Sequence, residues 1–176
     1  MLSMLIAPLL LQGRSWGADW ALTQGRLTYT VKHTLKTSHG FSEELKGKIK
    51  CAHQSCEVLI AVPVNTFKSG DTNRDLHMIQ TTKGAIFPMI VARTTLKESD
   101  LESPHSLDLP FKLQFAGKEA DVIAKNMKID SDHENRMVNG SLALSLKSFG
   151  IEAPSLLGMS IEDQVEVSFN ANWKKQ

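Results

Sequence analysis

The sequence predicts an all-β protein: an eight-stranded antiparallel barrel with a short helix after the third strand. Apolar and polar residues alternate with a period of two in eight separate segments, as in strands that bury one face. Polar turns join these segments, and no long crossover helices of the kind that parallel strands require separate them. Eight such strands must close or stack, and a barrel of this size either fills with side chains or holds one small ligand. A β-sandwich is the alternative.

The first four predicted strands lie in the N-terminal half. Residues 27–34 alternate leucine, tyrosine and valine with threonine and lysine, and residues 45–51 alternate apolar residues with three lysines. Residues 58–64 place valine and isoleucine at every second position, and Pro63 lacks the N–H that a central strand would donate. Residues 89–96 form the fourth strand, directly after a proline.

The other four strands lie in the C-terminal half. Residues 106–116 alternate most clearly, with leucine or phenylalanine at five successive positions of one face. Residues 120–129 alternate less regularly, and residues 138–147 keep leucine in phase with a glycine. Residues 164–173 set valine, phenylalanine and tryptophan against polar side chains. Most of the eight segments thus combine an apolar and a solvated face.

Two insertions interrupt the strands. The first covers residues 69–84 and predicts a short helix, because Asp71 or the next residue can cap its start and Asp75 lies in its first turn. Gly84 can end that helix. The second covers residues 148–161, an apolar segment that two glycines and a proline punctuate.

Length and charge limit the classes of function. The chain has 176 residues, which suits one domain, and its formal net charge is +1. No basic block and few aromatic residues are available for nucleic acid, so we expect no nucleic-acid partner. Outside the N-terminus no segment approaches the 18 apolar residues of a membrane span, so we expect no stable membrane insertion.

The N-terminus predicts a signal peptide over residues 1–18. Its apolar run, residues 2–11, is too short to span a bilayer, and Gly17 and Ala18 suit cleavage. No lysine or arginine precedes the run, and a buried N-terminal helix is the alternative. We expect export, to the periplasm or outside the cell, with residues 19–176 as the mature barrel domain.

The two cysteines fit an exported protein. Cys51 and Cys56 have four residues between them and lie between two predicted strands, so a disulfide would close a hairpin. Two free thiols are one alternative. A zinc site that includes His53 is another, although it would need two more ligands. Haem attachment requires C-x-x-C-H, which does not occur.

Catalytic motifs are absent from the sequence. The six histidines have no helical metal-ligand spacing, and neither G-x-S-x-G nor a phosphate-binding loop occurs. We therefore predict neither an enzyme nor a metal site.

Two stretches resemble the YceI-like family. Residues 62–88 contain V-P-V-N-T-F, S-G-D-T-N-R-D-L-H-M and F-P, similar to the family's V-x-V-x-S-F, S-G-[ND]-x-x-R-D-x-H-M and aromatic-Pro. The second insertion resembles its D-F-G-I-x-x-P run, with Ser148 at the usual aspartate position. The resemblance covers residues 20–173 and implies a lipocalin-like barrel that holds a long apolar molecule such as a polyisoprenoid. In the family an aromatic residue is usual near Ala92, so the cavity is expected to be wider or differently shaped here.

Strand parity and this resemblance select the candidate site. Inward apolar residues would line the ligand, while residues of the helix and of the second insertion would close the mouth. Arg74 or His77 would bond a ligand head group; alternatively, Arg74 and Asp75 would fasten the helix to the barrel rim and His77 would be structural. The predicted ligand-contacting residues are Tyr29, Val31, Leu45, Ile60, Val62, Phe67, Leu76, His77, Ile79, Phe111, Leu113, Leu144, Phe149, Leu156, Val167 and Phe169.

The sequence therefore predicts a periplasmic or secreted carrier of an apolar chain, with no catalysis. The predicted carrier needs no cofactor, although a polyprenyl quinone or fatty acid could be the bound chain. Whether the carrier forms a homodimer stays open. The first alternative is a structural or stress-response interaction module with a packed core and no ligand. The second is a small redox or stress-related accessory protein that uses a bound quinone or the cysteine pair.

Overall fold

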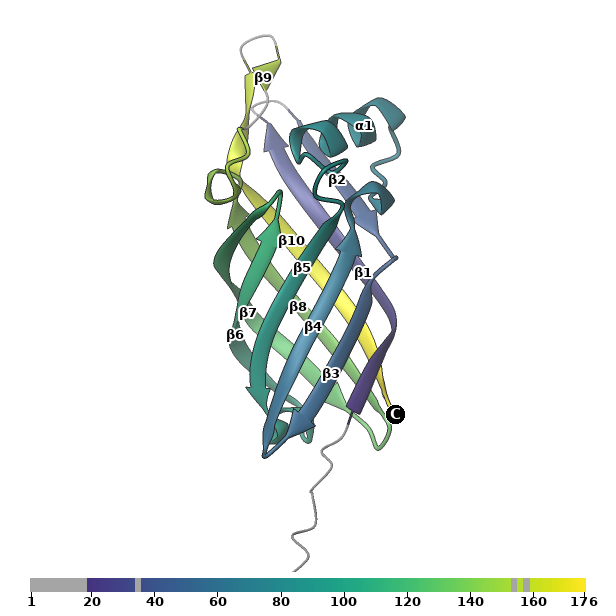
Figure 1. The fold of residues 1–176 in the computed structure, drawn as a ribbon. Helices are drawn as coiled ribbons and strands as arrows, with labels where there is room; N and C mark the ends of the chain where they lie inside the picture. Colours follow the sequence, from purple (N-terminus) through teal and green to yellow (C-terminus); the bar gives the residue numbers. More distant parts are fainter. Residues whose placement is uncertain (1–18, 34–35, 153–154, 157–158) are drawn as a thin grey trace, which may run out of the picture.

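The computed structural model describes residues 19–33, 36–152, 155–156 and 159–176. They form a tall β-barrel with a helix across one end (Figure 1). The strands are β1 (Asp19–His33), β2 (Thr37–Ser42), β3 (Lys46–Ala52), β4 (Ser55–Pro63), β5 (Met89–Lys97), β6 (His105–Phe115), β7 (Lys118–Ser131), β8 (Asn135–Ser145), β9 (Ser155–Leu156) and β10 (Met159–Lys175). The helices are η1 (Val64–Thr66), α1 (Thr72–Thr81), η2 (Glu98–Leu101) and η3 (Lys147–Phe149).

All strands pair in antiparallel fashion, in the order β2-β1-β3-β4-β5-β6-β7-β8-β10-β9. β1 also pairs with β10 over most of its length, which closes the sheet. β2 and β3 pair one after the other with the same edge of β1, at residues 27–32 and 19–21, and together fill one place in the wall. β9 pairs only with β10, so the closed wall has eight places. The predicted eight-stranded antiparallel barrel is therefore confirmed.

The predicted place of the helix was wrong, because α1 follows β4 and not the third strand. The additional strand is β2, which pairs with residues 27–32 of β1. Its inward positions are Ser38, Gly40 and Ser42, all buried. Since these residues are small and not apolar, β2 lacks the alternation of hydrophobicity that marks the other strands.

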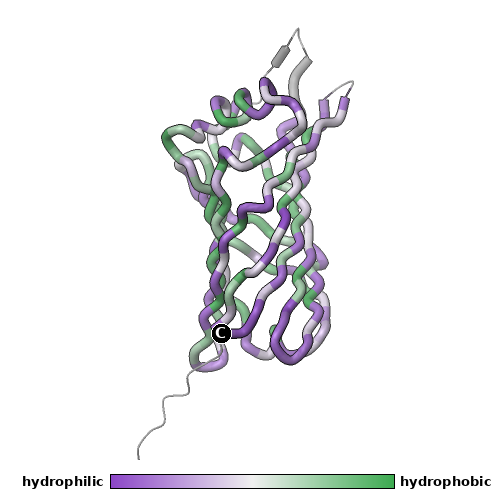
Figure 2. Tube along the Cα trace, turned by 90° about the vertical axis from the view of Figure 1, so that its right-hand side faces the viewer, coloured by the Kyte–Doolittle hydropathy of each residue, from purple (hydrophilic) through white to green (hydrophobic). Residues whose placement is uncertain are grey.

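The weak alternation of β7 has a physical cause. Asn126 has a positive φ of 48°, and the register with β8 shifts there, as in a β-bulge. Ala124 and Met127 consequently both face the core, where they are buried. Asp108 stabilises the bulge by accepting hydrogen bonds from the Asn126 N–H at 2.8 Å and the Lys125 ammonium at 3.1 Å. β6 keeps an uninterrupted period of two, and Figure 2 shows hydrophobic and hydrophilic stretches following one another along the barrel strands.

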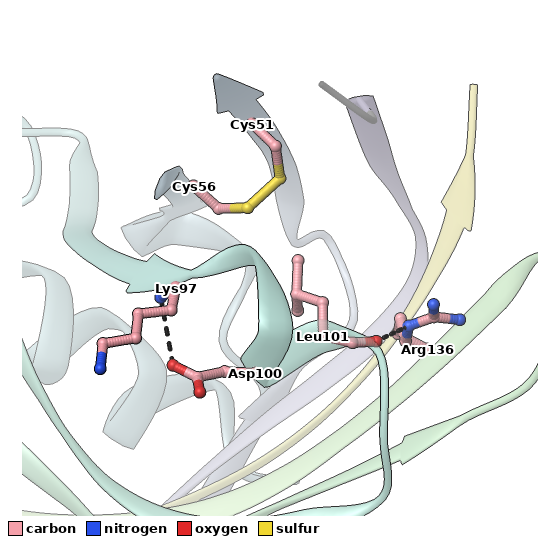
Figure 3. The surroundings of a disulfide bond; sticks show 6 residues. All are labelled: Cys51, Cys56, Lys97, Asp100, Leu101 and Arg136. Carbon is pink, nitrogen blue, oxygen red and sulfur yellow. Dashed lines mark hydrogen bonds between the residues drawn. A yellow bond between two sulfur atoms is a disulfide. The ribbon is translucent and has the colours of Figure 1, made fainter. Parts of the chain in front are cut away.

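One end of the barrel is packed shut. Trp20, Trp173 and Leu101 are at most 3% exposed there, and the Cys51–Cys56 disulfide joins β3 to β4 beside them (Figure 3). This disulfide confirms the predicted pairing. Within the described residues, these buried side chains fill this end of the barrel.

A buried arginine completes the seal. Arg136 donates hydrogen bonds to the carbonyls of Leu101 and Asp132, and to that of Asn135 at 2.8 Å. Its guanidinium lies 4.3 Å from the centroid of the Trp20 ring. Because η2 carries Leu101, these contacts hold η2 across the end of the barrel.

Candidate functional site

The barrel interior is less densely packed from its middle to the α1 end. Several inward apolar side chains are only half-buried there, although they point into the barrel. Such side chains keep accessible surface only if space adjoins them inside the wall or at the mouth. They are Leu27, Tyr29, Val31, Ile60, Ile90, Ala92, Leu142 and Phe169.

Two glycines keep aromatic rings close to the wall. A Cβ atom added at Gly40 would lie 2.6 Å from the Tyr29 ring, and one added at Gly140 would lie 2.6 Å from the Phe169 ring. Gly40 and Gly140 stand directly opposite these aromatic residues on neighbouring strands. Each ring therefore lies over the backbone of the next strand, which leaves more of the centre of the barrel open than a ring over a larger side chain would.

The helix α1 lies across the mouth and is fixed by a polar network. Asp75 accepts hydrogen bonds from the Ser69 N–H at 2.9 Å and the Ser69 hydroxyl at 2.5 Å. Arg74 donates through Nε to the Ser69 hydroxyl at 2.9 Å and through Nη1 to the buried Ser38 hydroxyl at 3.1 Å. Because Ser38 belongs to β2, this network joins α1 to the barrel wall, which favours the fastening role of Arg74 and Asp75.

Tyr29 links this network to the interior. Its ring centroid lies 5.8 Å from that of Phe67, which is buried under α1. Burial raises the pKa of the Tyr29 phenol, the charge of Asp75 raises this pKa further, and the charge of Arg74 opposes the increase. A neutral phenol thus stands at the boundary between the apolar interior and the polar mouth.

The N-cap of α1 is also polar. Asp71 accepts a hydrogen bond from the Arg74 N–H at 3.1 Å, as an N-cap does. This bond lowers the pKa of the Asp71 carboxyl. The predicted capping by Asp71 is what places Arg74 and Asp75 in the first turn, facing the rim.

The structure places most of the predicted ligand-contacting residues inside the barrel or under α1. Leu76 and His77 are different: Leu76 is 53% exposed and His77 is exposed, both on the outer side of α1. The ligand contacts predicted for them stay predictions. Leu156 lies in β9, but its side chain is outside the described residues. Buried positions are taken by Val62, Phe67, Phe111, Leu113, Leu144, Phe149 and Val167, and half-buried ones by Tyr29, Val31, Leu45, Ile60, Ile79 and Phe169.

Sequence reasoning missed several interior residues. Leu27, Ile90 and Leu142 follow the same parity as the predicted ones, so that signal was present in the sequence. Met78 also packs against the core, because the inner side of α1 carries Met78 and Ile79. The sequence alone could not show whether Leu76 or Met78 faces the core, because the hydrogen bonds that fasten the first turn of α1 set the rotation of the helix.

The outer wall carries a groove of about 690 Å³ whose lining also includes the buried core residues Val58 and Phe111. It forms where β5 and β6 separate, since these strands pair only over residues 91–93 and 112–114. Leu59 and Pro110 line it together with several lysines. Most of the lining side chains face outward, so we do not take this groove as the candidate site.

The described part of the chain also bears on metal binding and on membrane crossing. No group of three or more histidine, cysteine or acidic side chains is placed there to hold a metal ion. Within the same residues, no helix combines the length and the apolar character that crossing a membrane requires.

A closed antiparallel barrel with an apolar interior, sealed at one end and covered by a short helix at the other, is a lipocalin-like barrel. The chain belongs to the YceI-like family, since the YceI-like domain matches residues 19–173. No curated protein matches the sequence.

Solved structures share the fold at low sequence identity. One is a polyisoprenoid-binding domain from Saccharophagus degradans implicated in plant cell wall breakdown, with a TM-score of 0.77, 15% identity and coverage of 89% of this chain and 98% of that one. Another is BcnA of Burkholderia cenocepacia, with a TM-score of 0.65, 13% identity and coverage of 84% and 95%. A YceI protein of Campylobacter jejuni gives 0.50, 10% identity and coverage of 100% and 92%. Such likenesses establish the fold.

Proposed function

We propose that this protein is a non-catalytic carrier that holds one long apolar chain in its barrel. The half-buried belt of inward apolar residues, including Ile60, Leu142 and Phe169, is the observation that carries this proposal. Each buried CH₂ group of a ligand is stabilised by about 0.8 kcal/mol, so a chain gains affinity without specific polar contacts. Family membership and the polyisoprenoid-binding neighbour support a polyisoprenoid, quinone or fatty-acyl chain.

The ligand enters past α1 with its head group near Tyr29. The other end is sealed by Trp20, Leu101 and Arg136, which favours one entrance over a channel. The phenol of Tyr29 is placed to bond a carbonyl, carboxyl or phosphate head group. It is a donor at neutral pH, as an ordinary tyrosine is, and burial raises its pKa further.

The protein works outside the cytoplasm. The Cys51–Cys56 disulfide supports an oxidising compartment, and residues 1–18 supply the predicted signal peptide. Cys51 is 5% exposed and Cys56 is fully buried, so nothing in the barrel favours thiol exchange with a partner, as the redox alternative requires.

Native mass spectrometry of the protein purified from its host, followed by solvent extraction, tests this proposal. We expect a stoichiometric apolar species on the native protein. The variant Ala92→Trp fills the middle of the barrel and should lose it, while Ile123→Trp, at an outward position 48% exposed, should keep it.

Circular dichroism of both variants shows whether the barrel remains folded. A clean apo mass that does not change after incubation with quinones and fatty acids would contradict the carrier proposal. It would favour the alternative of a packed interaction module.

A further inference from the structure

Exposed large apolar side chains are concentrated at the mouth of the barrel. Seven such residues are found in the described part of the chain, and four of them lie between positions 76 and 89. Leu76 is 53% exposed, Ile86 71%, Phe87 38% and Met89 36%. Single exposed apolar residues are ordinary, but a concentration beside a proposed ligand entrance indicates an interaction surface.

These residues belong to consecutive segments at the α1 end of the barrel. On α1 the inner side carries Met78, Ile79 and the buried Thr82, so Leu76 lies on the outer side. Lys83 lies just beyond the end of α1 at Thr81 and has a positive φ of 55°, so it belongs to the turn that follows the helix. Its carbonyl then accepts hydrogen bonds from the N–H groups of both Ile86 and Phe87, at 2.9 Å each.

Phe87 extends the region to the barrel rim. A Cβ atom added at Gly117, in the turn between β6 and β7, would lie 2.5 Å from the Phe87 ring. The ring therefore covers this turn while 38% of the residue stays exposed. The turn and the helix belong to the same end of the barrel (Figure 1), where Figure 2 shows hydrophobic stretches of the chain. We call Leu76, Lys83, Ile86, Phe87 and Met89 the mouth surface.

The charge of this region is one-sided. Residues 76–97 contain no aspartate or glutamate, while His77 and Lys83 are exposed among the apolar residues. The carboxylates nearest along the chain have the Arg74 guanidinium beside them: its Nη2 lies 4.0 Å from Asp71, and Ser69 bonds both Arg74 and Asp75. Lys83 is the one charged member of the mouth surface, and Glu119, two residues beyond Gly117, lies 4.0 Å from the Lys112 ammonium. The charge of the mouth surface is therefore basic, which complements anionic lipid head groups.

We propose that the mouth surface docks the barrel onto a lipid bilayer that contains anionic lipid. This inference rests on the proposed carrier function. A long apolar chain is nearly insoluble in water, so transfer is fastest when the entrance touches the acyl region directly. Ile86 and Phe87 enter the boundary between head groups and acyl chains, and Lys83 contacts the phosphates. The contact is peripheral and reversible.

Flotation with vesicles of phosphatidylcholine, with and without phosphatidylglycerol, tests this docking. We expect the native protein to float with the anionic vesicles, and added salt to weaken the binding. The variant with Ile86→Ser and Phe87→Ser should bind at least about tenfold more weakly, because two side chains lose their burial. Ile86→Ser alone should keep the fold intact, since Ile86 is 71% exposed, and should still weaken binding.

A matched control replaces exposed apolar residues elsewhere. Ile123 and Met137 are 48% and 46% exposed on other parts of the barrel, so Ile123→Ser with Met137→Ser should bind vesicles as the native protein does. Lys83→Glu should reduce binding to the anionic vesicles selectively. If the control loses as much binding as the mouth variant, or if Lys83→Glu has no effect, the proposed surface is wrong.

Two further measurements separate this inference from the carrier function. A protein that carries an extractable apolar ligand but does not float with either vesicle overturns docking and leaves the carrier function standing. A protein that floats but never holds a ligand retains docking and overturns the carrier. If sedimentation shows a dimer that Ile86→Ser dissociates, and no vesicle binding occurs, the mouth surface joins two copies of this chain and the bilayer proposal fails.

Discussion

Replacing Arg136 by methionine tests whether this residue seals the end of the barrel that lies opposite α1. Methionine keeps much of the apolar volume of the side chain but removes every donor. Three carbonyl groups lose a charged partner, and the cation–π contact with Trp20 disappears. The carbonyls of Asp132 and Asn135 belong to exposed residues, so water can replace the arginine there.

The size of the loss in stability depends mainly on the carbonyl of Leu101. This residue is 3% exposed, and its carbonyl keeps only the Ser131 hydroxyl as a donor, at 3.3 Å. A weakened bond at a buried carbonyl costs about 1–2 kcal/mol. The cation–π contact contributes about 1 kcal/mol. We therefore expect Arg136→Met to lower the free energy of unfolding by about 2–3 kcal/mol.

Urea unfolding followed by tryptophan fluorescence measures this change. Arg136→Lys keeps the charge over Trp20 but not the fork of donors, so we expect about half of the loss. Arg93→Met is the control, because Arg93 is exposed on the outer wall and should change stability by less than about 0.5 kcal/mol. If Arg136→Met unfolds at the same urea concentration as Arg93→Met, Arg136 does not hold the seal.

Three other changes test contacts elsewhere in the barrel. Reducing the Cys51–Cys56 disulfide, or replacing both residues by alanine, should cost about 2 kcal/mol in urea unfolding, because the closed loop is short. Gly140→Ala places a Cβ atom 2.6 Å from the Phe169 ring, so it should cost about 1–3 kcal/mol and reduce the amount of bound ligand in native mass spectrometry. The pKa of Asp163 is lowered below 3.8 by a hydrogen bond from the Ser145 hydroxyl and, to a smaller extent, by one from the Lys147 N–H. The ionised Asp163 therefore stabilises the fold at neutral pH, and this contribution is lost as the pH falls through the lowered pKa. Asp163→Asn should remove this part of the acid sensitivity in thermal unfolding.

The barrel could be predicted because its strands repeat one simple pattern. A period of two survives wherever the inward residue is large and apolar, as at Phe111 and Leu113. It fails in β2, where the ring of Tyr29 lies over Gly40 and needs a residue without a side chain beneath it. The feature that conceals β2 in the sequence is thus the same one that positions an aromatic ring at the mouth.

The closed end of the barrel could not be predicted for a different reason. Arg136 follows a polar turn and resembles any exposed charged residue in the sequence. Its burial depends on the carbonyl of Leu101, which is 35 residues away, and on Trp20 in the first strand. Contacts between distant segments leave no local pattern, so sequence periodicity cannot detect them.

The two ends of the barrel together set how a ligand would move. Because Arg136 and Leu101 hold η2 across one end, a chain cannot pass through and must leave by the end at which it entered. The mouth at the other end is not freely open, since Arg74 ties α1 to Ser38 of the wall. Replacing Arg74 by methionine should loosen α1, raise both the uptake and release rates of the ligand, and leave the seal at Arg136 unaffected. Stopped-flow transfer of a fluorescent fatty acid from vesicles measures these rates. Unchanged rates in a folded Arg74→Met protein would mean that α1 does not control entry.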